Sequence, residues 1–569
     1  AKPDLYDYLT HTNTDTGHYF SLPVIGDIAK LSEPSAIPAE IYPHYSVASK
    51  KAEFGCLPNV DRFFASIDNK VFVWRQGQIC SDQFEEADIV TGVCAIEPNV
   101  DFFIDSVTAL LVVLTQKYVK IIPFINDTLR TDIYYVTETN FVGFSVCQAG
   151  DCVLIGAHNG KIFKLSFTNG SGISLGGSVS LFNQPAGLKL TNLSGGILPD
   201  FMRLNADAAI KLVYDSSSGY LGVIGESSSI HFYHLTEGGS LKYLARFVPS
   251  KDRTIVSMSY IPLSQSLRVR FVAFDDCGTR YYFGSTPSLM CCGSSFGLIS
   301  KIMPPVELEG KRVSCGQSTL GCTLMLAENL LIMLRQQDIG HFEFCEQLFF
   351  VSLQGVVQSA AVYNHYLSFI KEAVFKDPNW WQHQIPPPVM LVITSESVYR
   401  LDFKYPAAIL QRLLQNWDGL LTGDVEEMLK YDERPEEGCA LALLVDEQDN
   451  CGLGLHAAST FSQEISKDTD QIAVLTKAIV LRAARLLRFV FQLECFMKFS
   501  TFYIVNTTIP CLPPNYIDSL KRIQTIIESI ALNPVEYDIT DEEVSFLKEV
   551  DAVINDSTEV IQMLKVLSK

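Results

Sequence analysis

Positive charge is scarce in this sequence, and charged residues of either sign are few. Only 19% of the 569 residues are charged, and 64 acidic residues outnumber 44 basic ones, which gives a formal net charge of -20. The low charged fraction argues against extended disorder. The negative sign opposes broad, non-specific binding to nucleic acid. We therefore expect no specific nucleic acid among the partners of this protein.

Long hydrophobic runs are also absent, which excludes an obvious membrane-spanning helix. The best run, ALLVVL before Thr115, has the length of a strand, whereas a helical span needs about 20 apolar residues. The first residues, AKPDLYDYLTHTNT, contain no apolar signal-peptide core. They also lack a starting Met, so we expect a processed or cut piece of a longer protein. The 15 irregularly spaced cysteines indicate free, mostly buried thiols in a reducing compartment.

Motifs of catalysis and cofactor binding are missing as well. The sequence contains no Walker A motif, no CxxC pair and no Gly-x-Ser-x-Gly elbow. His231 and His234 are three residues apart on an expected strand, so they face opposite sides and do not share a metal easily. We expect no catalytic residue, no cofactor and no metal, although a missing motif does not by itself exclude an enzyme.

The chain is instead rich in β pattern from about residue 60 to residue 403. A strand, a tight polar turn and a second strand recur seven times. The copies are FFASIDNKVFVW, ALLVVLTQKYVKIIPF, CVLIGAHNGKIFKLSF, YLGVIGESSSIHFYHL, RFVAFDDCGTRYYFG, TLMLAENLLIMLRQ and VMLVITSESVYRLDF. Such a unit cannot bury both of its faces alone, but radial repetition buries each sheet against the next. The sequence therefore predicts a seven-bladed β-propeller over residues 51–404, with stacked sandwiches as the alternative.

The two ends of the chain differ from this β region. Residues 1–50 carry scattered Pro, Asp and Thr with weak periodicity, which predicts an extended N-terminal leader. After residue 405 the spacing becomes helical, as in AAILQRLLQNW and the long apolar TDQIAVLTKAIVLRAARLLRFVFQLECFMKF. Consecutive helices with short connections predict the truncated start of an α-helical solenoid over residues 405–569, with a helical bundle as the alternative.

Three tryptophans are candidates for packing or for partner contact. We expect Trp74 to pack between blades. Trp380 and Trp381 lie in the Pro-rich segment KDPNWWQHQIPPP, where an exposed aromatic pair could dock a peptide. Packing of both rings within a core or loop is the alternative.

One stretch invites comparison with a membrane-contacting helix. Wound as a helix, SLMCCGSSFGLISKIM would set an apolar face against a Ser/Gly face of little charge, as in a lipid-packing sensor. The alternation in LISKIM favours the other interpretation, a strand and loop of the propeller. The candidate membrane contacts are Leu289, Cys292, Phe296, Ile299 and Met303.

Basic residues recur along the longest helical segment. Arg482, Arg485 and Arg488 are spaced to share one face of a helix and are candidate partner contacts. The alternative is a solvated edge of a solenoid helix.

Several segments, taken in order, resemble the scaffold nucleoporins of the 155-kDa inner-ring class. EFGCLPNVDRFFASIDNKVFVW is similar to the opening blade of that family, and LIGAHNGKIFKLSF resembles its Gly-x-(Asp/Asn)-Gly-x-(Leu/Ile)-(Tyr/Phe) blade. LKLTNLSGGILPDFM, DDCGTRYYFGSTP, LLVDEQ and RAARLLRFVF resemble further family segments. The resemblance covers about residues 50 to 500. Some family members carry a curvature-sensing propeller loop, but the loop after Arg253 is too short to hold one.

The resemblance implies a propeller followed by a solenoid, without catalysis and without a cofactor. It implies a scaffold of the inner ring of the nuclear pore complex at the nuclear envelope. Partner nucleoporins would bind through short linear motifs, on strand edges and helical grooves, and the pore membrane or its proteins would be a further partner. A vesicle-coat scaffold of similar layout is one alternative. A propeller enzyme or ligand-binding protein that uses its central channel is another.

Overall fold

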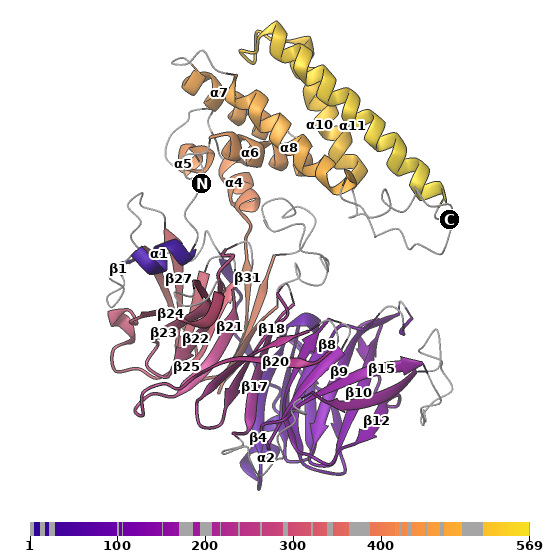
Figure 1. Ribbon diagram of the computed structural model, residues 1–569, viewed down its shortest axis with the longest axis vertical. Coiled ribbons are helices and arrows are strands. Elements are labelled where there is room, and N and C mark those ends of the chain that lie inside the picture. The colour runs from indigo at the N-terminus through magenta and orange to yellow at the C-terminus, as the bar shows by residue number, and fades with distance from the viewer. Residues whose placement is uncertain are drawn as a thin grey trace. The chain divides into compact units, whose positions relative to one another are not determined.

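A computed structural model describes most of the chain, which divides into two compact units (Figure 1). One unit comprises Ala1–Ala373 with Pro388–Phe403, and the other comprises Val374–Pro387 with Lys404–Lys569. The described residues are 5–11, 18–21, 29–99, 102–104, 106–150, 152–169, 186–193, 207–216, 218–236, 239–261, 265–287, 294–319, 322–337, 345–363, 387–415, 417, 419, 424–430, 435–449, 452–466, 472–491 and 516–567.

The first unit consists of seven sheets, which we number as blades in chain order. Blade 1 contains β4 (Ala52–Leu57), β5 (Arg62–Ile67), β6 (Lys70–Trp74) and β7 (Asp82–Glu85). Blade 2 contains β8 (Val90–Ile96), β9 (Val107–Thr115), β10 (Tyr118–Ile125), β11 (Thr128–Leu129) and β12 (Tyr135–Glu138). Blade 3 contains β13 (Gly143–Ala149), β14 (Cys152–Ala157), β15 (Ile162–Asn169) and β16 (Ala186–Asn192). Blade 4 contains β17 (Ala209–Asp215), β18 (Tyr220–Gly225), β19 (Ile230–Leu235) and β20 (Leu241–Phe247).

The remaining three blades have the same antiparallel order. Blade 5 contains β21 (Ile255–Tyr260), β22 (Val269–Asp275), β23 (Arg280–Pro287) and β24 (Ser294–Ile302). Blade 6 contains β25 (Val313–Thr319), β26 (Cys322–Ala327), β27 (Leu330–Gln337) and β28 (Cys345–Ser352). Blade 7 contains β29 (Val357–Tyr363), β30 (Val389–Thr394) and β31 (Ser397–Phe403). The seven hairpins expected from the sequence are the second and third strands of these blades.

The burial pattern follows from the position of each strand in its blade. The second strands β5, β14, β26 and β30 are buried at every residue, because a neighbouring blade covers each of their faces. Outer strands such as β7 and β20 alternate or remain largely exposed. The hairpin turns use residues with positive φ, among them Asp68 at 52° and Gly160 at 70°.

The innermost strands close into a ring. β4, β8, β13, β17, β21, β25 and β29 contact one another in this order, and β29 contacts β4 again. Carbonyl groups of the hairpin turns bind the first residue of the next blade, as in Val90 N to Asp68 O at 2.9 Å and Val357 N to Glu328 O at 2.7 Å. This radial closure confirms the expected seven-bladed propeller and excludes stacked sandwiches.

Residues 1–50 are not the extended leader that the sequence predicts, since most of their described part packs on the blades. The segment forms α1 (Leu5–His11), β1 (His18–Ser21), β2 (Ala29–Leu31), β3 (Ser35–Ala36) and α2 (Ile41–Ser46). β1 pairs parallel with β28, and β2 and β3 pair antiparallel with β31. These pairings join residues more than 300 positions apart, such as Ala29 with Phe403. Local periodicity in the sequence therefore cannot predict them.

A compact aromatic cluster fills the seam between blades 7 and 1. Trp74 and Phe63 are fully buried and stack with ring centroids 6.1 Å apart. Val389 and Leu391 of blade 7 pack on them, and so does Ile41 of α2. Trp74 therefore packs between blades, as expected, and α2 is the wedge that covers this seam.

Asp68 fixes the end of the N-terminal segment to the first hairpin turn. Its carboxylate accepts hydrogen bonds from the backbone N–H groups of Ser49, Lys50 and Lys51 at 3.0, 2.8 and 2.9 Å. Because these donors favour the ionised form, they lower the pKa of Asp68 from 3.8 to about 2.

The second unit is helical, as expected from the sequence. Its described helices are α4 (Pro406–Gln415), α5 (Asp424–Lys430), α6 (Pro435–Asp449), α7 (Leu453–Ser466), α8 (Val474–Phe491), α10 (Tyr516–Leu532) and α11 (Asp541–Leu567). α6 contacts α4, α5, α7 and α8, and α8 in turn contacts α10 and α11. Thr540 and Glu543 form a reciprocal capping box before α11. None of the described helices is both long and apolar enough to cross a bilayer.

The wedge role of α2 predicts different effects for two neighbouring substitutions. Ile41 is fully buried, so Ile41→Ala leaves a cavity at the seam and lowers the free energy of unfolding by about 2–5 kcal/mol. The neighbouring Tyr42 is 45% exposed, so Tyr42→Ala has little effect. Denaturant unfolding followed by tryptophan fluorescence compares the two variants. Equal losses would contradict the wedge role.

The hydrogen bonds to Asp68 predict a pH dependence of stability. The folded state holds the pKa of Asp68 at about 2, below its ordinary 3.8. Its stabilising effect is therefore complete above pH 4 and disappears as the pH falls through about 2. Asp68→Asn removes this part of the acid dependence, which unfolding midpoints between pH 2 and 5 would show. Asp556→Asn, at an exposed position of helix α11, is the matched control and should leave the acid dependence unchanged. If Asp68→Asn has the same pH profile as the wild type, the assignment to Asp68 is refuted.

Candidate interaction surfaces

The candidate membrane helix over residues 288–303 is wrong for its described part, which is strand β24. Phe296 packs on Phe232 of blade 4, with ring centroids 4.9 Å apart, whereas Ile299 packs into the cluster shared with blade 6. Residues three apart on a strand face opposite sides, so these two side chains cannot form one apolar face. Met303 follows the strand and is 37% exposed. Leu289 and Cys292 lie outside the described residues.

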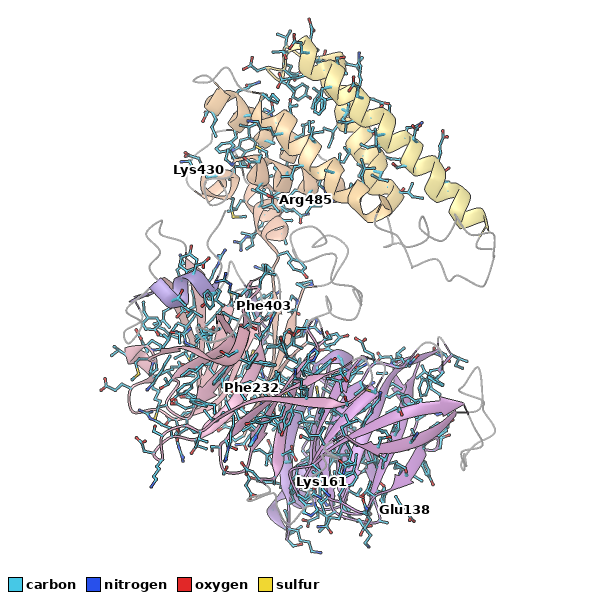
Figure 2. All side chains as sticks on the ribbon, in the orientation of Figure 1. Glu138, Lys161, Phe232, Phe403, Lys430 and Arg485 are labelled. Atoms are coloured by element: carbon cyan, nitrogen blue, oxygen red, sulfur yellow. The ribbon has the colours of Figure 1, made fainter. Side chains whose placement is uncertain are left out.

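The arginines of α8 do not form the exposed stripe expected as a partner contact. Arg482 is only 2% exposed. Arg485, labelled in Figure 2, belongs to α8. It donates from Nη2 to both carboxylate oxygens of Glu437 on α6 at 2.6 Å. Both side chains therefore serve helix packing. The side chain of Arg488 is outside the described part of the chain, as are Trp380 and Trp381, so their proposed contacts stay predictions.

One end of the propeller ring holds a pocket of about 300 Å³ where blades 5, 6 and 7 meet. Its lining consists of Thr254, Val256, Asp276, Arg312, Val313, Ser314, Glu328, Val356 and Val357. The wall is mostly aliphatic, and Arg312 Nη2 lies 3.4 Å from Asp276 Oδ2. This lining includes neither histidine nor cysteine. It does not provide the cluster of carboxylates and histidines that would favour a channel enzyme.

Side chains from distant blades meet at other ends of the innermost strands. The Tyr363 hydroxyl, at the end of β29, donates to the carboxylate of Glu97, which follows β8. Glu97 N–H donates to Gln148 Oε1 of β13 at 2.9 Å. Hydrogen bonds thus connect blades 7, 2 and 3, and these polar groups serve the ring.

An acidic cluster on blade 5 has a structural explanation. Asp275, Asp276 and Cys277 place potential metal-ligand atoms within 4.8 Å of one another. However, Asp275 Oδ1 already accepts from Cys277 N at 3.0 Å and from Thr279 N at 2.8 Å, and Oδ2 accepts from the Tyr281 hydroxyl at 3.1 Å. The carboxylate therefore shapes the β22–β23 turn. Burial raises the pKa of Tyr281 most strongly, and the negative charge of Asp275 raises it further.

A fully buried ion pair joins blades 5 and 6. Arg280 donates from Nη1 and Nη2 to the two carboxylate oxygens of Glu346 at 2.6 and 2.5 Å. Tyr19 of β1 accepts from Arg280 at 3.0 Å and donates to Met303 O at 2.6 Å. Burial opposes the charge of Arg280, but Glu346 outweighs it and holds the pKa of the guanidinium well above its usual value. Burial raises the pKa of Tyr19.

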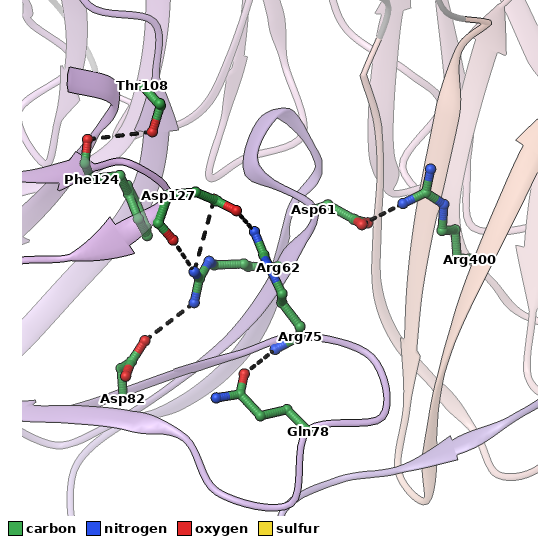
Figure 3. Close-up of polar contacts among 9 residues, drawn as sticks. All are labelled: Asp61, Arg62, Arg75, Gln78, Asp82, Thr108, Phe124, Asp127 and Arg400. Carbon is green, nitrogen blue, oxygen red and sulfur yellow. Dashed lines mark hydrogen bonds and ion pairs between the residues drawn. The ribbon is translucent and has the colours of Figure 1, made fainter. Parts of the chain in front are cut away.

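Two further arginines connect blade 1 to both of its neighbours (Figure 3). Arg62 of β5 donates to Asp127 O of blade 2 at 2.6 Å and to Asp82 Oδ2 at 3.2 Å. Burial lowers the pKa of Arg62 most strongly, and repulsion by the positive charge of Arg75 lowers it further. On the other side, Arg400 of β31 pairs with Asp61 of blade 1. The sequence does not predict these contacts of Arg62 and Arg400, because the partner residues lie on different blades.

A comparison with known families now identifies the chain. The family model described as Nup133 N terminal like matches residues 26–319, which is slightly more than half of the sequence. The chain belongs to this nucleoporin family. The resemblance to scaffold nucleoporins, drawn over about residues 50 to 500, is therefore confirmed, and the family match covers its part up to residue 319.

Relatives and solved structures agree with this family. A probable nucleoporin of Schizosaccharomyces pombe is 19% identical over 274 residues, which cover 43% of this chain and 20% of the relative. The present chain therefore aligns with only about a fifth of the length of the Schizosaccharomyces pombe protein. The crystal structure of Chaetomium thermophilum Nup170 NTD in complex with Nup53 has a TM-score of 0.69 at 14% identity and covers 98% of this chain and 90% of its own. That similarity shows a shared fold.

A second solved structure is much more distant. Chaetomium thermophilum Raptor has a TM-score of 0.38 at 9% identity and covers 66% of this nucleoporin and 29% of its own chain. Similarity of this size carries no information about function.

The Arg280–Glu346 pair predicts a marked asymmetry between single and double substitutions. Arg280→Met leaves Glu346 buried without its partner and should destabilise the propeller by about 3–5 kcal/mol. The double variant Arg280→Met/Glu346→Leu removes both charges and should recover most of that loss. Denaturant unfolding of the three proteins measures the coupling. A double variant as unstable as the single one would contradict the pairing as the cause.

Proposed function

We propose that this chain is a structural scaffold component of the nuclear pore complex, located in its inner ring at the nuclear envelope. The observation that carries the proposal is a family match over residues 26–319 on a closed propeller with the fold of Nup170 NTD. We infer no catalytic activity, because the chain belongs to a nucleoporin family and its buried ion pairs serve packing between blades and between helices. Residues 405–569 would begin an α-solenoid that continues the scaffold, and nucleocytoplasmic transport of protein and mRNA would depend on it indirectly.

The partners in this proposal are other nucleoporins that bind through short linear motifs. The similar Nup170 NTD was crystallised in complex with Nup53, which supports a nucleoporin partner for this chain as well. Strand edges at the rim of a propeller and grooves between helices are the usual docking places for such segments. Because the described part of residues 288–303 is a strand, the proposal rests on protein partners.

Localisation distinguishes the nuclear pore from the alternative of a vesicle coat. A fluorescent fusion of this chain, expressed in its own cells, should give a continuous or punctate nuclear rim that coincides with a pore marker. Cytoplasmic vesicle puncta without a rim would overturn the proposal in favour of a coat. A fusion carrying Arg280→Met, which should destabilise the propeller, is the control for targeting by the folded chain.

A further inference from the structure

The propeller already accepts added strands at the rims of two blades. β1 pairs with β28 in parallel register from His18↔Cys345 to Ser21↔Leu348. β2 adds to β31 in the antiparallel direction. Both added strands come from the N-terminal segment, which is distant in sequence from its partner strand. The outer edge of a blade in this molecule is therefore a surface that binds an extended peptide segment.

β20 is a blade edge to which no described strand is added. It is the last strand in the order β17-β18-β19-β20, so its ladder involves β19 alone among the described residues. By contrast, α1 contacts the outer strand β24 of blade 5, and β1 and β2 cover blades 6 and 7. β20 spans seven residues, Leu241–Phe247, which is long enough for a peptide to form several backbone hydrogen bonds.

The side chains along β20 give this edge a chemical character opposite to that of the whole chain. β20 itself contains two cationic side chains, Lys242 and Arg246, and no carboxylate, although the net charge of the protein is -20. Lys242 and Arg246 are exposed, and neither forms an ion pair with a described residue. Tyr243 is 54% exposed and packs edge-on against Tyr233, with ring centroids 5.7 Å apart.

Neighbouring elements reinforce the positive character of the edge. Lys164 Nζ of blade 3 lies 3.6 Å from the position that a Cβ would take at Gly239. Asp207, which precedes β17 of the same blade, accepts hydrogen bonds from Ser227 N at 2.8 Å and Ser229 Oγ at 2.7 Å. Asp207 is therefore engaged by the β18–β19 turn.

We propose that the outer edge of β20 binds an extended acidic segment of a partner protein, which adds to blade 4 as a fifth strand. Backbone hydrogen bonds to β20 would hold the segment. Carboxylates would approach Lys242 and Arg246, and an apolar side chain would lie on Tyr243. A β-bulge at Leu244 pairs Lys242 with His234 and Arg246 with His231, which are three residues apart on β19, so the two cations face opposite sides of the blade. Tyr243 pairs with Tyr233 and lies on the side of Arg246. A segment with carboxylates on both faces and an apolar residue beside Tyr243 therefore fits best. The proposal rests on the proposed function, because it names the surface for a linear-motif partner.

A synthetic peptide tests the proposal directly. The probe is a labelled nine-residue peptide with Glu at neighbouring positions, and so on both faces of a strand, on each side of a central Phe, and its binding is followed by fluorescence anisotropy. Lys242→Glu/Arg246→Glu should weaken binding by about tenfold or more, since two attractive contacts become repulsive. Arg312→Glu, at an 82% exposed side chain on a different blade, is the matched control and should bind normally.

Backbone pairing has its own readout. The same peptide with alternate amides N-methylated keeps its charge but cannot complete a ladder, so its binding should be lost. Hydrogen exchange should show new protection of β20 amides with the parent peptide. Equal binding of both peptides, no binding at all, or normal binding to the charge-reversed variant would each overturn the proposal.

Positive charges on an edge strand also protect against self-association, and this role has a distinct signature. Charge reversal would then cause oligomers in size-exclusion chromatography while the peptide fails to bind wild type, which overturns the docking proposal. The nuclear-rim assay separates the two proposals. A rim without peptide binding refutes the β20 site alone, whereas peptide binding without a rim refutes the pore location and leaves the β20 site standing.

Discussion

Closure of the ring between blade 7 and blade 1 is the constraint on which the rest of this structure depends. Every blade of a propeller buries its two faces on its neighbours, so an open seam would expose the faces of both terminal blades. Blade 7 has only three strands of its own, and the N-terminal segment supplies the missing outer strand. Ser32 then accepts from Arg400 N–H at 2.9 Å and from Gln76 of blade 1 at 2.7 Å. Wedge helix α2 completes the seam over Trp74.

The same constraint explains how the molecule uses its buried charges. Arg280 with Glu346, Arg62 with Asp127, and Arg400 with Asp61 each connect elements of different blades. Buried or half-buried ion pairs add little net stability compared with apolar packing, but they make a wrong arrangement costly. We infer that these pairs fix which blade meets which. They are consequently engaged in assembly of the ring, and the surfaces of the molecule remain for binding.

The sequence predicts the repeated elements well and the long-range ones poorly. Each hairpin, such as β5–β6 around Asp68, is encoded by a local pattern of apolar runs and a turn residue with positive φ, so the seven blades could be counted. β1 and β2 carry no such pattern, because His18 and Ala29 find their partners at Cys345 and Phe403. Their strand character exists only once the ring is formed.

The candidate contacts that fall on described residues failed for a related reason. The helical wheel drawn for residues 288–303 assumed an isolated segment, whereas Phe296 and Ile299 are packed by blades 4 and 6 on opposite sides of one strand. Arg485 is part of a helical face in the sequence, but its partner Glu437 comes from another helix. A single sequence gives the composition of a face and not what covers it.

The way the ring closes also determines where a partner could bind. The N-terminal segment uses β-strand addition twice, at β28 and at β31, so those two edges are occupied within the same chain. A partner that uses the same backbone chemistry is left with edges that the N-terminal segment does not reach. Among these, β20 carries two cations that form no ion pair with a described residue and an exposed tyrosine, so it attracts carboxylates and repels a second copy of the same edge. This charge favours an acidic strand of another protein over pairing between two copies of β20. Ring closure and the choice of docking edge thus follow from one rule: the open edge of a strand must either be paired or carry features that prevent unwanted pairing.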